Sequence, residues 1–194
     1  IKLLTADTKN IMNDHNYFII IDGHEDIAWN ALELGRNYLQ DVSAGRQAEK
    51  NGLIPTLIGE RLIGLPEWIK GNVALVFATL FVTPASHAEK LDQRMIYHSA
   101  EEAQRLCHQE LQFYQQLADQ TSSVQIVKSW QDVQSVLTSW QNGQPQIGVV
   151  LLMEGADGIF CPSEAGEWYE KGLRIIGLAW SGTRYAGGTG APGG

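Results

Sequence analysis

The fold is decided by the stretch YFIIIDGHED, which runs from Tyr17 to Asp26. Its first half is apolar and β-rich, which is typical of a fully buried strand in a parallel sheet. Residues just past the carboxyl end of such a strand lie where parallel α/β folds build active sites. His24 and Asp26 are two positions apart, so an extended backbone points both side chains the same way. Together they suit a metal ion, by default zinc, although an ordinary polar strand end would look the same.

The rest of the chain alternates apolar runs with helical patterns. After the first strand (Tyr17–Asp22), further strands are predicted at Asn72–Val82, Val124–Lys128, Ile147–Met153 and Leu173–Ala179. Helices are predicted at Ser99–Asp119, Ser129–Trp140 and Ser163–Lys171, and Trp29–Lys50 looks partly helical. The clearest helix begins at Ser99, which forms a capping box with Glu102. Strands separated by helices indicate a parallel sheet.

Polar residues follow the predicted strands, which favours a barrel over an open doubly wound sheet. We therefore expect an α/β fold, a parallel (β/α)8 TIM-type barrel. Such a barrel typically has ~250 residues, so this chain of 194 residues would supply about its first five strands. Residues 1–194 would be the N-terminal portion of a single metallo-hydrolase domain. The unpaired sheet edge and the glycine-rich tail predict a missing C-terminal half, in the same protein or as a second chain.

Charge, cysteine content and apolar stretches indicate which binding partners and which cellular compartment to expect. The net charge of -8 and a pI near 5.0 argue against nucleic-acid binding, which usually needs a basic face. Cys107 and Cys161 have neither a disulfide framework nor C-x-x-C spacing, which favours a reducing compartment. No apolar stretch approaches the ~20 residues that a membrane span needs. The expectation is a cytoplasmic protein.

Three segments together resemble the membrane dipeptidase (renal dipeptidase-like) family of zinc peptidases. The first is Asp22–Asp26 (DGHED), which matches the family's D-G-H-x-D at the end of its first barrel strand. The second is Met153–Gly155 (MEG), which follows the apolar IGVVLL. The third is Gly177–Thr183 (GLAWSGT) with the RYAGG that follows it. Their order and spacing extend the resemblance over the chain from about Asp14 onward.

The resemblance implies a site for two zinc ions in which His24 and Asp26 bind one ion and Glu154 bridges both. A carboxylate has two oxygens, so it can hold two cations ~3.5–4 Å apart. A water shared by the two ions would attack the carbonyl of a small peptide. The family's remaining metal ligands and its proton-transfer groups come from later strands. No catalytic residue is therefore assigned within this chain, which alone is expected to be inactive.

Trp180 and Tyr185 are candidate substrate-binding residues, because they follow the last predicted strand on the expected metal face. Animal members of the family carry a histidine where Trp180 stands, which leaves the substrate open. Two alternatives also stay open. One is another metal-dependent amide or lactone hydrolase on the same barrel, and the other is a non-catalytic half-barrel that serves as an interaction module. A homodimer is compatible with either.

Overall fold

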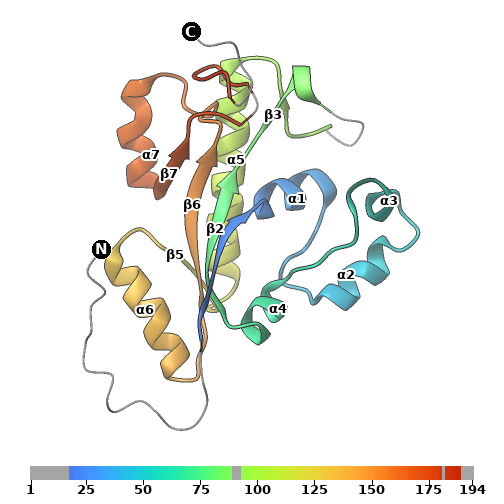
Figure 1. The fold of residues 1–194 in the computed structure, drawn as a ribbon, viewed down its shortest axis with the longest axis vertical. Coiled ribbons are helices and arrows are strands. Elements are labelled where there is room, and N and C mark those ends of the chain that lie inside the picture. The colour runs from blue at the N-terminus through green and yellow to red at the C-terminus, as the bar shows by residue number, and fades with distance from the viewer. Residues whose placement is uncertain (1–17, 89–92, 181, 189–194) are drawn as a thin grey trace.

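The computed structural model describes residues 18–88, 93–180 and 182–188, and it shows a parallel sheet with helices packed around it (Figure 1). The sheet strands are β1 (Ile20–Glu25), β2 (Val73–Leu80), β5 (Val124–Ile126), β6 (Ile147–Glu154) and β7 (Leu173–Gly177). Their pairings are all parallel. This confirms the α/β class with parallel strands. Within the described residues the sheet is open and does not close into a barrel.

Strand β6 is the centre of the sheet. Its Gly148–Met153 segment pairs with β2 along one edge. On the other edge, β5 pairs with the first three residues of β6, and β7 pairs with Leu151–Glu154. The expectation of five consecutive barrel strands is therefore wrong in one respect, because β5 and β7 share one edge of β6. Strand β5 has only three residues before the chain turns toward the next helix, so it cannot span the sheet.

Strand β1 is not the fully buried strand that its sequence predicts. Ile20 is 39% exposed and Ile21 is 57% exposed, because β1 pairs with β2 alone among the described strands. Strand β7 has a similar open side, on which Ile175 and Ile176 are each 39% exposed. The apolar side chains of both strands are therefore only partly buried by the described residues.

The long helices begin where the sequence predicts. Helix α5 (Ala100–Gln120) has Ser99 as its N-cap, and the Ser99 hydroxyl accepts a hydrogen bond from the Glu102 amide over 3.3 Å. Helix α6 (Trp130–Gln141) is capped in the same way by Ser129. Helix α7 (Ala165–Lys171) follows a short 3-10 turn, η2 (Pro162–Glu164). Helix α5 buries its apolar stripe, including Leu106 and Tyr114, in the core.

The segment between β1 and β2 contains more helices than predicted. Helix α1 (Ile27–Leu34) ends at Gly35, whose positive φ of 74° separates it from α2 (Val42–Glu49). Two short helices, α3 (Ile54–Ile58) and α4 (Leu65–Lys70), were not predicted, and both are shorter than a periodic pattern can reveal. After β2 come the short strands β3 (Thr83–Pro84) and β4 (Ile96–Tyr97) and the turn η1 (Ala85–His87).

Among the described residues, we find no helix that is both long enough and apolar enough to cross a membrane.

Candidate metal centre

Strands β1 and β6 place three potential metal ligands at the same edge of the sheet. Both run parallel to β2, so their carboxyl ends lie on the same side. His24 lies near the end of β1, and Asp26 is the next residue after that strand. Glu154 is the last residue of β6. Gly155 follows it with a φ of 96°, a left-handed value that suits glycine and turns the chain off the sheet.

The three side chains converge on one point. The Nε2 atom of His24 lies 3.5 Å from Asp26 Oδ1 and 3.3 Å from Glu154 Oε2. One ligand atom from each residue can be chosen so that all three lie within 4.8 Å of one another. The convergence expected from the sequence is thus present. We call His24, Asp26 and Glu154 the triad.

Electrostatics at the triad favour a cation. Burial, and then the negative charge of Asp26, raise the pKa of Glu154, while His24 lowers it in part. Burial raises the pKa of the neighbouring Glu25 to about 8, with a hydrogen bond to Asp22 and the charges of Asp22 and Asp26 adding to the effect. Crowded carboxyl groups hold protons because their charges repel one another. A bound divalent cation would relieve that repulsion.

The donor set fits zinc. Zinc accepts imidazole nitrogen and carboxylate oxygen in one first coordination sphere. The triad is also accessible, since the His24 side chain is 48% exposed and the Glu154 side chain 22% exposed. Three protein ligands with room for more donors describe an open metal site rather than a closed structural one.

The candidate substrate residue Trp180 lies near Gly155, the residue that follows Glu154. A Cβ built on Gly155 would lie 4.0 Å from the Cβ of Trp180. Its ring packs edge-on against Phe81, with centroids 5.1 Å apart, and against His87 at 5.7 Å. This aromatic cluster could not be predicted from the sequence, because Phe81, His87 and Trp180 come from separate segments.

The other candidate, Tyr185, is engaged within the chain. Its hydroxyl donates to the backbone oxygen of Ile159 over 2.6 Å, and the Arg184 guanidinium lies 4.9 Å from its ring centre. The backbone amide of Arg184 donates to Asp157. These contacts tie the segment after β7 to the loop after β6.

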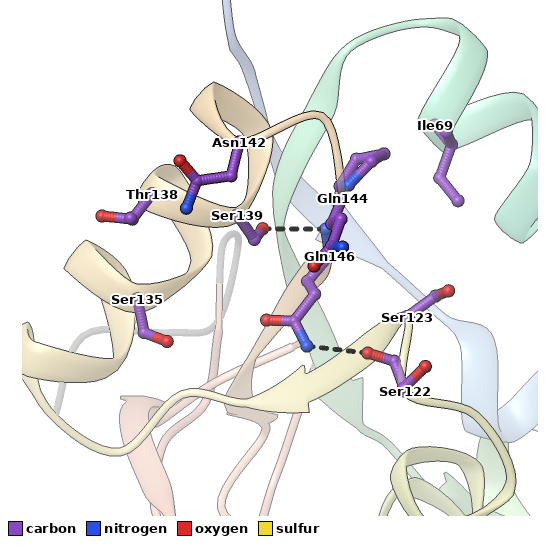
Figure 2. A pocket seen from close by; sticks show the side chains of 10 residues that line it. Ile69, Ser122, Ser123, Ser135, Thr138, Ser139, Asn142, Gln144 and Gln146 are labelled. Carbon is purple, nitrogen blue, oxygen red and sulfur yellow. Dashed lines mark hydrogen bonds between the residues drawn. The ribbon is translucent and has the colours of Figure 1, made fainter.

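A cavity of about 770 Å³ lies at the opposite end of β6, near its start (Figure 2). Its lining is uncharged and mostly hydroxyl or amide, with Ser122, Ser135, Ser139 and Gln146 among its members. Figure 2 shows that part of this polar surface is already hydrogen-bonded. The Ser139 hydroxyl accepts a bond from the backbone amide of Gln146, and the side-chain amide of Gln146 donates to the backbone oxygen of Ser122. Without an ionisable side chain, this lining offers no metal ligand and no general acid or base.

The fold and the triad together define a parallel α/β protein with a metal-site geometry at the carboxyl edge of its sheet. The sequence profile of the membrane dipeptidase family, peptidase family M19, matches residues 7–192. The chain belongs to this family.

The chain also resembles one curated protein and several solved structures. The chain is 29% identical over 173 residues to an uncharacterized protein in the PQQ-III 3' region of Acinetobacter calcoaceticus, with 84% of this chain and 49% of the relative covered. Among solved structures it resembles dipeptidase AC, a metallopeptidase of family M19, with a TM-score of 0.56 and 19% identity over 84% of this chain and 43% of that one.

Two further solved structures share the fold. One is a metallopeptidase from Rhodobacter sphaeroides bound to a phosphinate mimic of the dipeptide L-Ala-D-Ala, with a TM-score of 0.57, 19% identity, and coverage of 84% and 46% of the two chains. The other is the probable dipeptidase PvdM from Pseudomonas aeruginosa, with a TM-score of 0.59, 13% identity, and coverage of 84% and 34%. The chain therefore spans about half the length or less of the relatives it matches.

Proposed function

We propose that the complete protein containing this chain is a zinc-dependent hydrolase that cleaves dipeptides through a metal-activated water. The observation that carries the proposal is the convergence of the triad at the carboxyl edge of the sheet, in a chain that belongs to the membrane dipeptidase family.

Each residue of the triad has a distinct role in the proposal. His24 and Asp26 would hold one ion, and the two carboxylate oxygens of Glu154 would let it serve two ions. When bound, the two ions would acidify a shared water at neutral pH and polarise the scissile carbonyl. Trp180, which follows β7, would contact the substrate. Tyr185 holds the loop after β6 in place through Ile159.

We infer that further donors complete the site from a part of the protein outside this chain. Three ligands hold at most one ion well, and a two-ion site needs more. The relatives are about twice as long as the region that they share with this chain. The exposed isoleucines on the open sides of β1 and β7 are where additional strands of a barrel would pack.

The test uses the full-length protein, expressed and purified with zinc, and a panel of dipeptides that includes L-Ala-D-Ala. We expect stoichiometric zinc and hydrolysis of at least one dipeptide. Glu154→Gln should lose both, because an amide has only one good acceptor oxygen and cannot bridge two cations. Glu170→Gln, on the exposed face of α7, is the matched control and should change neither. Residues 1–194 alone should not turn over dipeptides.

Two results would change the proposed substrate class or the proposed catalytic role. Stoichiometric zinc with cleavage only of lactones or other amides would keep the metal site and change the substrate class. A full-length protein without zinc at the triad would favour a non-catalytic role.

A further inference from the structure

Strand β2 carries one hydroxyl side chain in an otherwise apolar, buried segment. Thr79 is fully buried, as are its neighbours Ala78 and Leu80. Its Oγ1 lies 2.6 Å from Oδ1 of Asp26 and 3.4 Å from the backbone oxygen of Glu25. A hydroxyl has one proton to donate, and a short contact to a carboxylate is the stronger of the two bonds. Thr79 therefore donates to Asp26.

The Asp26 carboxylate is available for this bond because it does not cap the helix that follows it. Asp26 occupies the N-cap position of α1, where aspartate commonly accepts a bond from the first turn. No such side-chain bond is present, and the backbone there has φ of -85° and ψ of 53°, outside the usual cap geometry. The carboxylate is turned toward β2 instead, where Thr79 meets it.

A buried tyrosine fixes the two partners relative to each other. The Tyr114 hydroxyl donates to the backbone oxygen of Thr79 over 2.9 Å and accepts from the backbone amide of Ala28 over 3.1 Å. Ala28 is two residues beyond Asp26, so this hydroxyl joins the start of α1 to β2. Thr79, Tyr114 and Ala28 are buried by this chain itself, while the Asp26 side chain is 42% exposed at the edge of the triad.

We propose that Thr79 is a positioning residue for the metal site. Its hydroxyl holds Oδ1 of Asp26, the same oxygen that lies 3.5 Å from His24 Nε2, and so sets the rotation of the carboxylate toward the triad. This inference rests on the proposed function for the presence of zinc. Hydrogen-bond partners of metal ligands typically contribute about 10–100-fold to metal affinity. Neither the D-G-H-x-D motif nor the apolar β2 pattern assigns such a role to Thr79.

The test measures zinc affinity of the full-length protein by competition with a chelator. Thr79→Val keeps the branched shape without the hydroxyl, and Thr79→Ala removes the hydroxyl without any clash. Both should bind zinc about 10–100-fold more weakly than the parent protein. Thr79→Ser keeps the hydroxyl and should restore affinity to near the parent value. In cobalt-substituted protein, the visible spectrum of the valine variant should shift while that of the serine variant should not.

The outcomes separate this inference from the proposed function. If Glu154→Gln loses zinc while the valine and alanine variants keep full affinity, the role of Thr79 is wrong and the metal site stands. If affinity follows side-chain size, so that serine and alanine both weaken binding and valine does not, Thr79 acts only through packing and the inference fails. If the parent protein holds no zinc at the triad, both proposals fall.

Discussion

The two ends of strand β6 differ in what they offer a ligand. Near its start lies a cavity of about 770 Å³ whose lining is uncharged. At its end, Glu154 meets His24 and Asp26 in a small, partly exposed group. The first end has space and hydrogen-bonding groups, some of which bond to each other, whereas the second has ionisable groups held close together. Donor chemistry, rather than volume, therefore makes the end of β6 the candidate metal site.

The largest difference between the two ends should appear on removal of a ligand. We expect His24→Ala to weaken zinc binding by more than about a hundredfold, because loss of a first-sphere ligand should exceed the 10–100-fold effect of an outer partner. Dipeptide hydrolysis should fall with it. Thr138→Ala, in the cavity lining, should leave both unchanged. Chelator competition on the full-length protein measures the affinities. Equal zinc affinity in the two variants would contradict the proposed difference between the two ends of β6.

The triad should also make zinc binding depend on pH. The raised pKa of Glu154 means that a proton competes with zinc for this carboxylate, so affinity should fall as the pH is lowered through that pKa. With one competing proton, the fall should be about tenfold per pH unit. Isothermal titration at several pH values measures it. Affinity that stays constant as the pH is lowered to 4, below the ordinary value of 4.5 from which the pKa of Glu154 is raised, would show that Glu154 is not a ligand.

The metal-free protein should respond to pH in the opposite sense. The pKa of Glu25 is about 8 in the folded protein, against 4.5 ordinarily, so the folded state binds more protons between these values. Stability should therefore fall as the pH rises from about 4.5 to 8. Glu25→Gln should remove part of this fall, on the order of 1 kcal/mol after solvent screening. Thermal unfolding of metal-free protein at pH 5 and pH 8 tests it, with Glu170→Gln as the control.

At the cavity end, substitutions should change stability alone. The Ser139 hydroxyl donates to the backbone oxygen of Val136 and accepts from the Gln146 amide. Ser139→Ala should cost about 1–2 kcal/mol of unfolding free energy, because the Gln146 amide loses its acceptor. Zinc affinity should not change. Denaturant unfolding gives the first value, and a loss of zinc in this variant would link the two ends in a way that the structure does not show.

The smallest effect is expected for the exposed members of the cavity lining. Asn142→Ala should change stability by no more than about 0.5 kcal/mol and leave zinc binding and hydrolysis intact. A large loss of activity would instead make the cavity a functional site.

The residues of the triad were easier to predict from the sequence than the arrangement of the sheet strands. His24 and Asp26 could be placed because a short apolar run leads directly into them, and parallel strands end at one edge. Glu154 needed the resemblance, since a single carboxylate after a strand is also an ordinary turn residue. Helix α5 could be predicted because its cap and its stripe are both local signals.

What could not be predicted depends on contacts between distant segments. The exposure of β1 follows from its place at the edge of the described sheet, which an apolar run does not reveal. The position of β5 beside the start of β6 depends on its short length. Thr79 looks like one polar residue in an apolar strand, and only the fold brings its hydroxyl to Asp26.

The central claim is that His24, Asp26 and Glu154 bind metal together. Anomalous diffraction from crystals of the zinc-loaded full-length protein, measured on both sides of the zinc absorption edge, tests it most directly. We expect zinc peaks about 2.0–2.2 Å from the His24 imidazole and from the carboxylates of Asp26 and Glu154, with Glu154 between two peaks. A zinc-loaded crystal whose anomalous peaks lie elsewhere, with no peak at these three residues, would contradict it.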